Sequence, residues 1–471
     1  MKKFSAAGFV AAICLYAIMH YLTFIFPADT GMVILSLSGI VAIVCAAINL
    51  SLRSFSIPLF LLTAATVVQL VSGGPLGAFF IDGIVQMRSL ITLLLIVPVI
   101  GWILREEPYI DSIMNVAHNL LDSSKKFYFG VMIVNQIIAY FLLFGSIPMM
   151  YQFINEFLRN KKSEAWEYFK GTALLRSFAL TTLWVVSIPS FAFAVDHLDA
   201  SLAGTIAQGF FISMGGILLA VWFASYKEKI YGINFTAGIK EEIDRLVQNT
   251  EDVKQSKRHV MEFACLFVSL FSTIFILHIT MGWGLLMVIP PVILVWTCAY
   301  FLVKRRGDRL FIQAKDYFGE EMKYKSQQFS LLLAAGMLIF SVNQSGIGNY
   351  LVDSLFYLEE VVPFLNFLVI LPFTVIFLGF LGLGPLTVIV LVAGILQNVS
   401  LPYPAELVVL SMTSGSVISV LLSPVILPII ILSATNGLSI LKNGFSFNLG
   451  YSIAFYLFVQ VYIQFMWYVV Y

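Results

Sequence analysis

Four short clusters of glycine, serine and proline interrupt apolar stretches of this chain, and their residue types suit the binding of an anion. They are Gly145–Pro148 (GSIP), Ser187–Pro189 (SIP), Gly382–Pro385 (GLGP) and Ser423–Pro424 (SP). Serine is a good helix N-cap, and proline is favoured in the first helical turn, where its missing N–H costs nothing. Each cluster therefore predicts the start of a half-helix, with unbonded N–H groups and the positive end of a helix dipole.

Four such ends, if they meet, would hold an anion without any buried Lys or Arg. Glycine at the cluster tips would let the backbone approach a ligand closely and adopt unusual dihedral angles. The competing interpretation, that Ser-Pro pairs only kink membrane helices, is weakened because four clusters recur in matching order. The candidate substrate-binding residues are Gly145, Ser146, Pro148, Thr182, Ser187, Pro189, Gly382, Gly384, Pro385, Thr413, Ser414, Ser423 and Pro424.

The elements that must position these residues are membrane helices. The chain has 471 residues, of which 60% are hydrophobic and 11% are charged, whereas soluble domains carry about 25% charged residues. Apolar runs of about 20 residues recur throughout, which is the length that crosses a bilayer. The net charge of +1 gives no indication of a nucleic-acid partner. The four cysteines match no metal motif, so no metal site and no catalytic residue are predicted.

Lysine and arginine in short loops predict which side of the membrane each loop faces. Lys2 and Lys3 place the N-terminus in the cytoplasm, and the expected location is the plasma (bacterial inner) membrane. We predict an all-α polytopic protein with about 11 transmembrane helices and two re-entrant hairpins. The spans are expected at about 6–26, 31–50, 56–71, 88–104, 172–195, 203–224, 260–279, 283–303, 405–434 and 450–470, with one more starting at Phe329.

The first hairpin is predicted over 127–158. Basic residues precede it (Lys125, Lys126) and follow it (Arg159, Lys161, Lys162), so both of its ends should be cytoplasmic. One crossing would place one basic group outside, and two full crossings do not fit in the available length. The chain is therefore expected to turn back at Gly145–Pro148. A counterpart over 361–396 has flanks without Lys or Arg, so it should enter from the outer side.

The order and spacing of these features predict an inverted repeat. Arg105 lies 40 residues before Gly145, and Asn343 lies 39 residues before Gly382. The predicted parts are an N-terminal helix (1–30), a first repeat (31–224), a linker (225–258) and a second repeat (259–471). Chance similarity is the alternative explanation of the spacing. The linker contains either an amphipathic helix on the membrane surface, with Ile239 on its apolar side, or a solvated segment.

On Gly145–Pro148, Ser187–Pro189, Gly382–Pro385 and Ser423–Pro424, the chain resembles the ion transporter superfamily. That group includes divalent-anion/sodium symporters and citrate carriers. The resemblance covers roughly residue 31 to the C-terminus and implies two inverted repeats, an elevator-type mechanism, a homodimer, and substrate and sodium held between hairpin tips and helix breaks. Carboxylate-transporting members usually carry a Ser-Asn-Thr-like triplet at the tip. Here the tips have fewer side-chain oxygens, so substrate identity does not transfer.

The function predicted from these features is secondary active transport of a small, anionic solute, with no enzymatic activity. Sodium is the candidate coupling ion because the predicted spans hold almost no carboxylates, with Glu156 and Glu262 near span ends. The alternative is a protein of lipid-linked or polymer export or biosynthesis, acting as a flippase-like partner or a transferase. A transferase would use loop residues such as Asp196, His197 and Asp199.

Overall fold

A computed structural model describes residues 2–109, 112, 113, 116, 123–158, 161, 163–247, 253–348, 350, 357 and 366–471 of the chain. Within these ranges every regular element is helical. The elements are α1 (Lys2–Ile25), α2 (Asp29–Asn49), α3 (Leu52–Val71), α4 (Leu76–Val85), α5 (Arg88–Ile96), η1 (Val97–Arg105), α7 (Ser124–Leu142), η3 (Leu143–Gly145), α8 (Ser146–Phe157), α9 (Glu164–Thr181), α10 (Pro189–His197), α11 (Leu202–Tyr231), α12 (Phe235–Val247), α13 (Val253–Met281), α14 (Leu285–Val303), α15 (Gly307–Asp316), η4 (Tyr317–Glu321), α16 (Met322–Tyr324), α17 (Ser326–Ser345), α19 (Phe367–Phe380), α20 (Gly384–Leu396), α21 (Ala405–Leu422), α22 (Leu427–Asn436), η5 (Lys442–Ser446), α23 (Phe447–Phe465) and η6 (Met466–Val470).

Eleven segments of the described chain are long and apolar enough to cross a membrane. The prediction of a polytopic helical membrane protein is therefore confirmed. Ten of the eleven correspond to predicted spans. The eleventh is Ser124–Phe157, which was predicted as a hairpin, and the span predicted at 172–195, in α9 and α10, is not among the eleven. The reason is that α9 carries Glu167, Lys170 and Arg176, which lower its mean hydropathy, and that α10 has only 9 residues.

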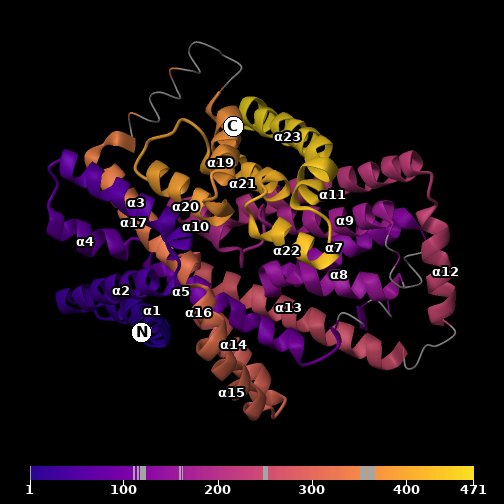
Figure 1. Cartoon of the computed structure of the whole chain (residues 1–471), viewed down its shortest axis with the longest axis horizontal. Coiled ribbons are helices and arrows are strands. Elements are labelled where there is room, and N and C mark those ends of the chain that lie inside the picture. Colours follow the sequence, from indigo (N-terminus) through magenta and orange to yellow (C-terminus); the bar gives the residue numbers. More distant parts are fainter. Residues whose placement is uncertain are drawn as a thin grey trace.

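The N-terminal helices form a bundle at one end of the molecule (Figure 1). Helix α1 packs along α2, and α17 from the second half of the chain packs against α3 and α4. The prediction that a span begins at Arg88 is wrong. The apolar segment starts at Leu76 and is interrupted at Gln86 and Met87, so Arg88 lies inside it. A charged residue normally marks the boundary of a membrane span, and for this reason the sequence analysis placed the start of the span at Arg88.

Helices α7 and α8 form a hairpin. Phe127 at the start of α7 and Phe157 at the end of α8 stack with ring centroids 5.2 Å apart. A continuous helix would separate two residues 30 positions apart by about 45 Å. The turn occurs at Leu143, whose φ of +50° is unusual for a residue with a side chain. Arg159 and Lys162 lie outside the described residues.

Helices α19 and α20 are joined by a second turn. Phe367 at the start of α19 stacks on Tyr403, which follows α20, with ring centroids 5.9 Å apart. The turn between the helices contains Gly382 and Gly384, which have φ values of +91° and +74°. Glycine is required here because these conformations strain any residue with a Cβ. The first residues of the predicted hairpin, 361–365, lie outside the described part.

Two interrupted helices, α9–α10 and α21–α22, lie side by side in opposite directions. A Cβ added to Gly171, near the start of α9, would lie 3.6 Å from Asn436 at the end of α22. At the other end, the backbone N–H of Ser201, after α10, donates to Glu406 at the start of α21 (3.1 Å). Within each hairpin unit the first arm runs in the same direction as the interrupted helix, α7 with α9 and α19 with α21.

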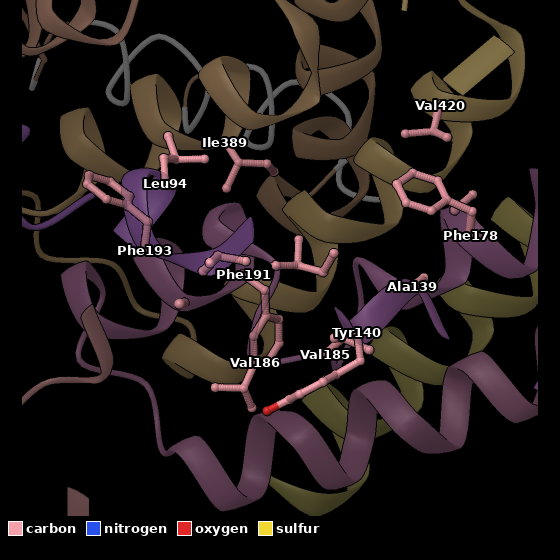
Figure 2. Packing of buried hydrophobic residues seen from close by; sticks show 14 of the residues in the cluster. Leu94, Ala139, Tyr140, Phe178, Val185, Val186, Phe191, Phe193, Ile389 and Val420 are labelled. Carbon is pink, nitrogen blue, oxygen red and sulfur yellow. The ribbon is translucent and has the colours of Figure 1, made fainter. Parts of the chain in front are cut away.

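The apolar core fills the space between these elements (Figure 2). Phe191 and Phe193 of α10 lie near Ile389 of α20. Phe178 of α9 lies near Val420 of α21. The core therefore connects residues from the first and second halves of the chain, so the two halves fold against each other.

The segment between the halves contains α12, whose apolar side contacts protein. Phe235 and Ile239 are fully buried, and the Phe235 ring lies 4.7 Å from the rings of both Trp166 and Phe169. This helix therefore packs on the start of α9.

Candidate substrate-binding site

The half-helices begin near the predicted clusters, and three of the predicted prolines lie in a first helical turn. Pro189 opens α10, Pro385 is the second residue of α20, and Pro148 is the third residue of α8. The prediction for Pro424 is wrong, because α22 starts at Leu427 and uses Pro428 in its first turn. Pro424 and Pro428 are four residues apart, and either could open this helix. The sequence does not distinguish the two starts.

Serine does not cap these helices as predicted, and it makes a different bond instead. The Ser187 hydroxyl donates to the carbonyl oxygen of Tyr140, near the end of α7 (2.7 Å). The Ser423 hydroxyl donates to the carbonyl oxygen of Gly379, near the end of α19 (3.1 Å). Both serines are buried. The same bond therefore ties each helix break to the turn of the hairpin that precedes it.

All four half-helices run outward from the interior. The C-terminal ends of α10 and α20 meet, because His197 and Leu396 line one cavity. Helix α22 ends beside the start of α9, and α8 also ends there because only six residues separate Phe157 from α9. The N-termini of these helices therefore point away from those ends, but they are not all buried: Gly145, Leu381, Val425 and Leu427, at or just before the starts of α8, α20 and α22, are exposed.

The glycines at the two tips differ in their surroundings. Gly382 has a positive φ, a conformation that favours glycine. A Cβ added to it would lie 3.4 Å from the side chain of Ile57 in α3. Gly145 is exposed and has an ordinary φ of −65°, and a Cβ added to it would make only an ordinary contact, 3.6 Å from Leu142 Cβ. The expectation that Gly145 adopts an unusual dihedral is wrong, because Leu143 makes the turn in its place.

Three of the six predicted hydroxyl donors bond to carbonyl groups of their own helices. Thr182 bonds to the carbonyl of Ala179, Thr413 to that of Val409 and Ser414 to that of Ser411. By contrast, Ser146, Ser416 and Ser419 are buried, and their hydroxyls have no hydrogen-bond partner among the described residues. Buried polar groups are normally paired. These three hydroxyls are therefore the better candidates for ligand contacts, and Ser146 is one of the predicted substrate-binding residues.

Elements that carry predicted site residues also pack across the halves: η3, which ends at Gly145, contacts α22, and α10 contacts α20. Gly382 lies near Val425 at the second break, and Pro148 and Pro424 are both half-buried. None of the hydrogen bonds of the described residues joins Gly145–Pro148 to Gly382–Pro385. A cavity of about 230 Å³ lies at the far ends of α10 and α20, where His197, Gln397 and Tyr403 contribute to its lining.

The sequence analysis missed Arg176, a fully buried arginine in α9. Its guanidinium donates to Asn448 Oδ1 (2.8 Å), to the carbonyl oxygen of Phe447 (2.9 Å) and to Tyr168 Oη (3.1 Å). The Tyr451 ring lies 4.5 Å from its charge, a cation–π contact. Arg176 lies inside the segment that was predicted as a span, so a search for cations within spans would have found it. It ties α9 to α23.

A buried ion pair lies about two turns before Arg176 in α9. Lys170 Nζ and Glu167 Oε1 are 2.6 Å apart, and both side chains are almost fully buried. Tyr151 of α8 also donates to Glu167 (2.8 Å). The carboxylate of Glu167 is thus fully engaged, which makes it a poor carrier of a coupling proton.

Of the three loop residues that a transferase would use, Asp196 and His197 have structural roles. Asp196 accepts the backbone N–H groups of Leu285 and Leu286 at the start of α14 (3.0 and 2.9 Å). His197 stacks on Phe193 and bonds to the carbonyl of the same residue. Asp196 therefore caps a helix, and His197 is held against its own helix.

Within the described residues, no group of three or more His, Cys, Asp or Glu side chains could hold a metal ion. No protein-family model matches the sequence, and no curated protein matches it.

Proposed function

We propose that this chain is a secondary active transporter of a small anionic solute, of the two-hairpin type that it resembles in sequence. The observation that carries the proposal is the paired hydroxyl-to-carbonyl bond, Ser187 to Tyr140 and Ser423 to Gly379, at two breaks in oppositely directed helices. We infer from this correspondence that α7–α11 and α19–α23 are inverted repeats, and that both hairpins are re-entrant.

The proposed site lies where the four half-helices begin. Their N–H groups and dipoles favour negative charge, and the unpaired hydroxyls of Ser146, Ser416 and Ser419 supply further donors. The strained Leu143 at the first tip fits the same role, because such conformations cluster at functional sites. Movement of one hairpin unit against the N-terminal bundle would give alternating access, the elevator-type mechanism.

Sodium remains the proposed coupling ion. Hydroxyl and carbonyl oxygens at the breaks are ligands of the type that sodium uses, and the half-helices α8, α10, α20 and α22 hold carboxylates only near their far ends, at Glu156 and Asp196. A homodimer, a cytoplasmic N-terminus and the bacterial inner membrane complete the proposal.

Uptake into proteoliposomes tests this function. The purified protein is reconstituted and given radiolabelled succinate, citrate, sulfate or phosphate, with or without a sodium gradient. Uptake of at least one anion is expected, and uptake should collapse in the Gly145→Trp variant. Gly145 is the sharper position because its φ permits a side chain and an added Cβ would make only an ordinary contact with Leu142, so the variant should fold. Gly77→Trp, at an open glycine, is the matched control.

Two results would contradict the proposal. One is full uptake by the Gly145→Trp variant, which would remove the tip from the site. The other is an absence of uptake for every anion while the protein is folded, which would favour the alternative of an export or biosynthesis partner.

A further inference from the structure

Arg88 lies at mid-depth in the N-terminal bundle. It is the first residue of α5, directly after the interruption at Gln86 and Met87. A Cβ added to Gly336, at the middle of α17, would lie 2.8 Å from the Met87 side chain. Since α17 is one of the membrane-crossing helices, Arg88 is far from either end of the bundle.

The guanidinium of Arg88 is poorly satisfied. Its one side-chain hydrogen bond goes to the sulfur of Met32, at 3.6 Å, although an arginine carries five N–H donors. No carboxylate of the described chain pairs with it. Arg176 shows what a satisfied buried arginine looks like in this protein, with three short bonds to oxygen. An arginine at membrane depth without such partners is a candidate functional group.

His20 of α1 is a second unsatisfied group beside Arg88. It is 3% exposed, and neither ring nitrogen has a hydrogen-bond partner in the part of the chain that the structure describes. Helix α1 packs against α5, so the charge of Arg88 acts on His20 and on Tyr16, one turn earlier on the same face of α1. Tyr16 is already engaged, because it donates to the carbonyl of Ile84 (2.7 Å). His20 is therefore left with free polar atoms near an unpaired cation.

The start of α5 adds backbone donors at the same place. The first N–H groups of a helix have no carbonyl within the helix to bond, and Arg88 is the first residue of this one. No glycine or proline explains the interruption at Gln86 and Met87. A break that places a helix N-terminus, an arginine and an unpaired histidine together has the donor set of an anion site.

We propose that Arg88 and His20, at the start of α5, bind an oxyanion of the phosphate or carboxylate type. The site lies in the N-terminal bundle, apart from the hairpin breaks, and does not depend on the transport proposal. Arg88 and Met32 are half-buried, and Phe80 and Ile81 of α4 nearby are exposed, so the site opens at the side of the bundle, and an anionic lipid headgroup drawn inward by the charge is one source of the oxyanion. A free anion has the same binding chemistry.

Thermal unfolding of the purified protein in neutral detergent tests the site. The added probes are dioctanoyl phosphatidylglycerol, inorganic phosphate and, as an uncharged-headgroup control, dioctanoyl phosphatidylcholine. The wild type should unfold at a higher temperature with phosphatidylglycerol or with phosphate, and the probe that acts identifies the source of the anion. In Arg88→Gln the apparent affinity should fall about tenfold or more, because charged hydrogen bonds are lost. Arg309→Gln, which alters an exposed arginine on α15, should respond like the wild type.

The ligand-free proteins provide a second readout. Arg88→Gln should unfold at the same temperature as the wild type or higher, since an unsatisfied buried charge is removed. The proposal is overturned if neither anion shifts the wild type, or if Arg88→Gln keeps the full shift. If Arg88→Gln does not fold, His20→Phe decides, because it keeps the ring shape and should also weaken the response.

Discussion

At the scale of single residues, the most informative groups are two arginines within apolar segments, Arg176 and Arg88. The low share of charged residues in the sequence does not lead one to expect charges there. Arg176 is fully buried and held by three oxygen acceptors and an aromatic face, whereas Arg88 has a single sulfur acceptor. Arginine therefore stabilises the fold at position 176, whereas at position 88 its N–H donors are available to bind the proposed anion. Only the surroundings decide between these roles, and they involve residues such as Asn448 that are distant in the sequence.

Replacing Arg176 with methionine should lower the free energy of unfolding by about 2–4 kcal/mol, because buried acceptors on Asn448 and Phe447 lose their donor. Arg176→Lys should also destabilise the protein, since an ammonium group cannot reproduce the planar fork. Thermal unfolding measures both, with Arg309→Met as the exposed control. Equal unfolding temperatures for Arg176→Met and Arg309→Met would contradict this assignment.

Lys325, directly before α17, gives a prediction about pH. Burial lowers the pKa of Lys325 to about 8, against 10.5 for a free lysine. Between these values the unfolded chain holds a proton that the folded chain has released, so this group makes the protein more stable as pH rises from about 8 to about 10.5. The slope is at most about 1.4 kcal/mol per pH unit. Lys325→Met should lack this rise in unfolding temperature, and identical pH profiles for the two proteins would refute the prediction.

At the scale of elements, glycines allow helices to approach closely where the hairpins meet the interrupted helices. A Cβ added to Gly415 of α21 would lie 2.6 Å from the carbonyl oxygen of Pro372 in α19. Backbone atoms cannot move aside as a flexible side chain can. The contact between the hairpin arm and the interrupted helix therefore depends on the absence of a side chain at this position.

Gly415→Ala should destabilise the protein by roughly 1–3 kcal/mol, the usual cost of overpacking. Gly77→Ala changes a helical glycine with nothing within 4 Å, so it should leave stability unchanged or raise it by up to about 1 kcal/mol. Comparing the two in thermal unfolding separates packing from helix propensity. If Gly415→Ala were as stable as Gly77→Ala, α19 and α21 would not be packed this closely.

At the scale of the whole molecule, the sequence predicted the class of fold and the doubling back of the first hairpin. Both follow from strong local signals, namely apolar length and the basic residues around 127–158. It missed the break before Arg88, because Gln86 and Met87 carry no glycine or proline signal. It placed the serine bonds wrongly, because a hydroxyl can donate to a distant carbonyl as easily as it can cap its own helix. Long-range partners of this kind, such as Ser187 with Tyr140, depend on how the helices pack.

The central claim is that the chain over 127–158 enters and leaves the membrane on one side. Single cysteines at Lys125 and Glu156, both exposed, are introduced into a protein without its four native cysteines and labelled with a membrane-impermeant maleimide in intact and in permeabilised cells. We expect both positions to label only after permeabilisation, while a cysteine at the exposed Asp199 labels in intact cells. Labelling of Lys125 and Glu156 from opposite sides would contradict the account.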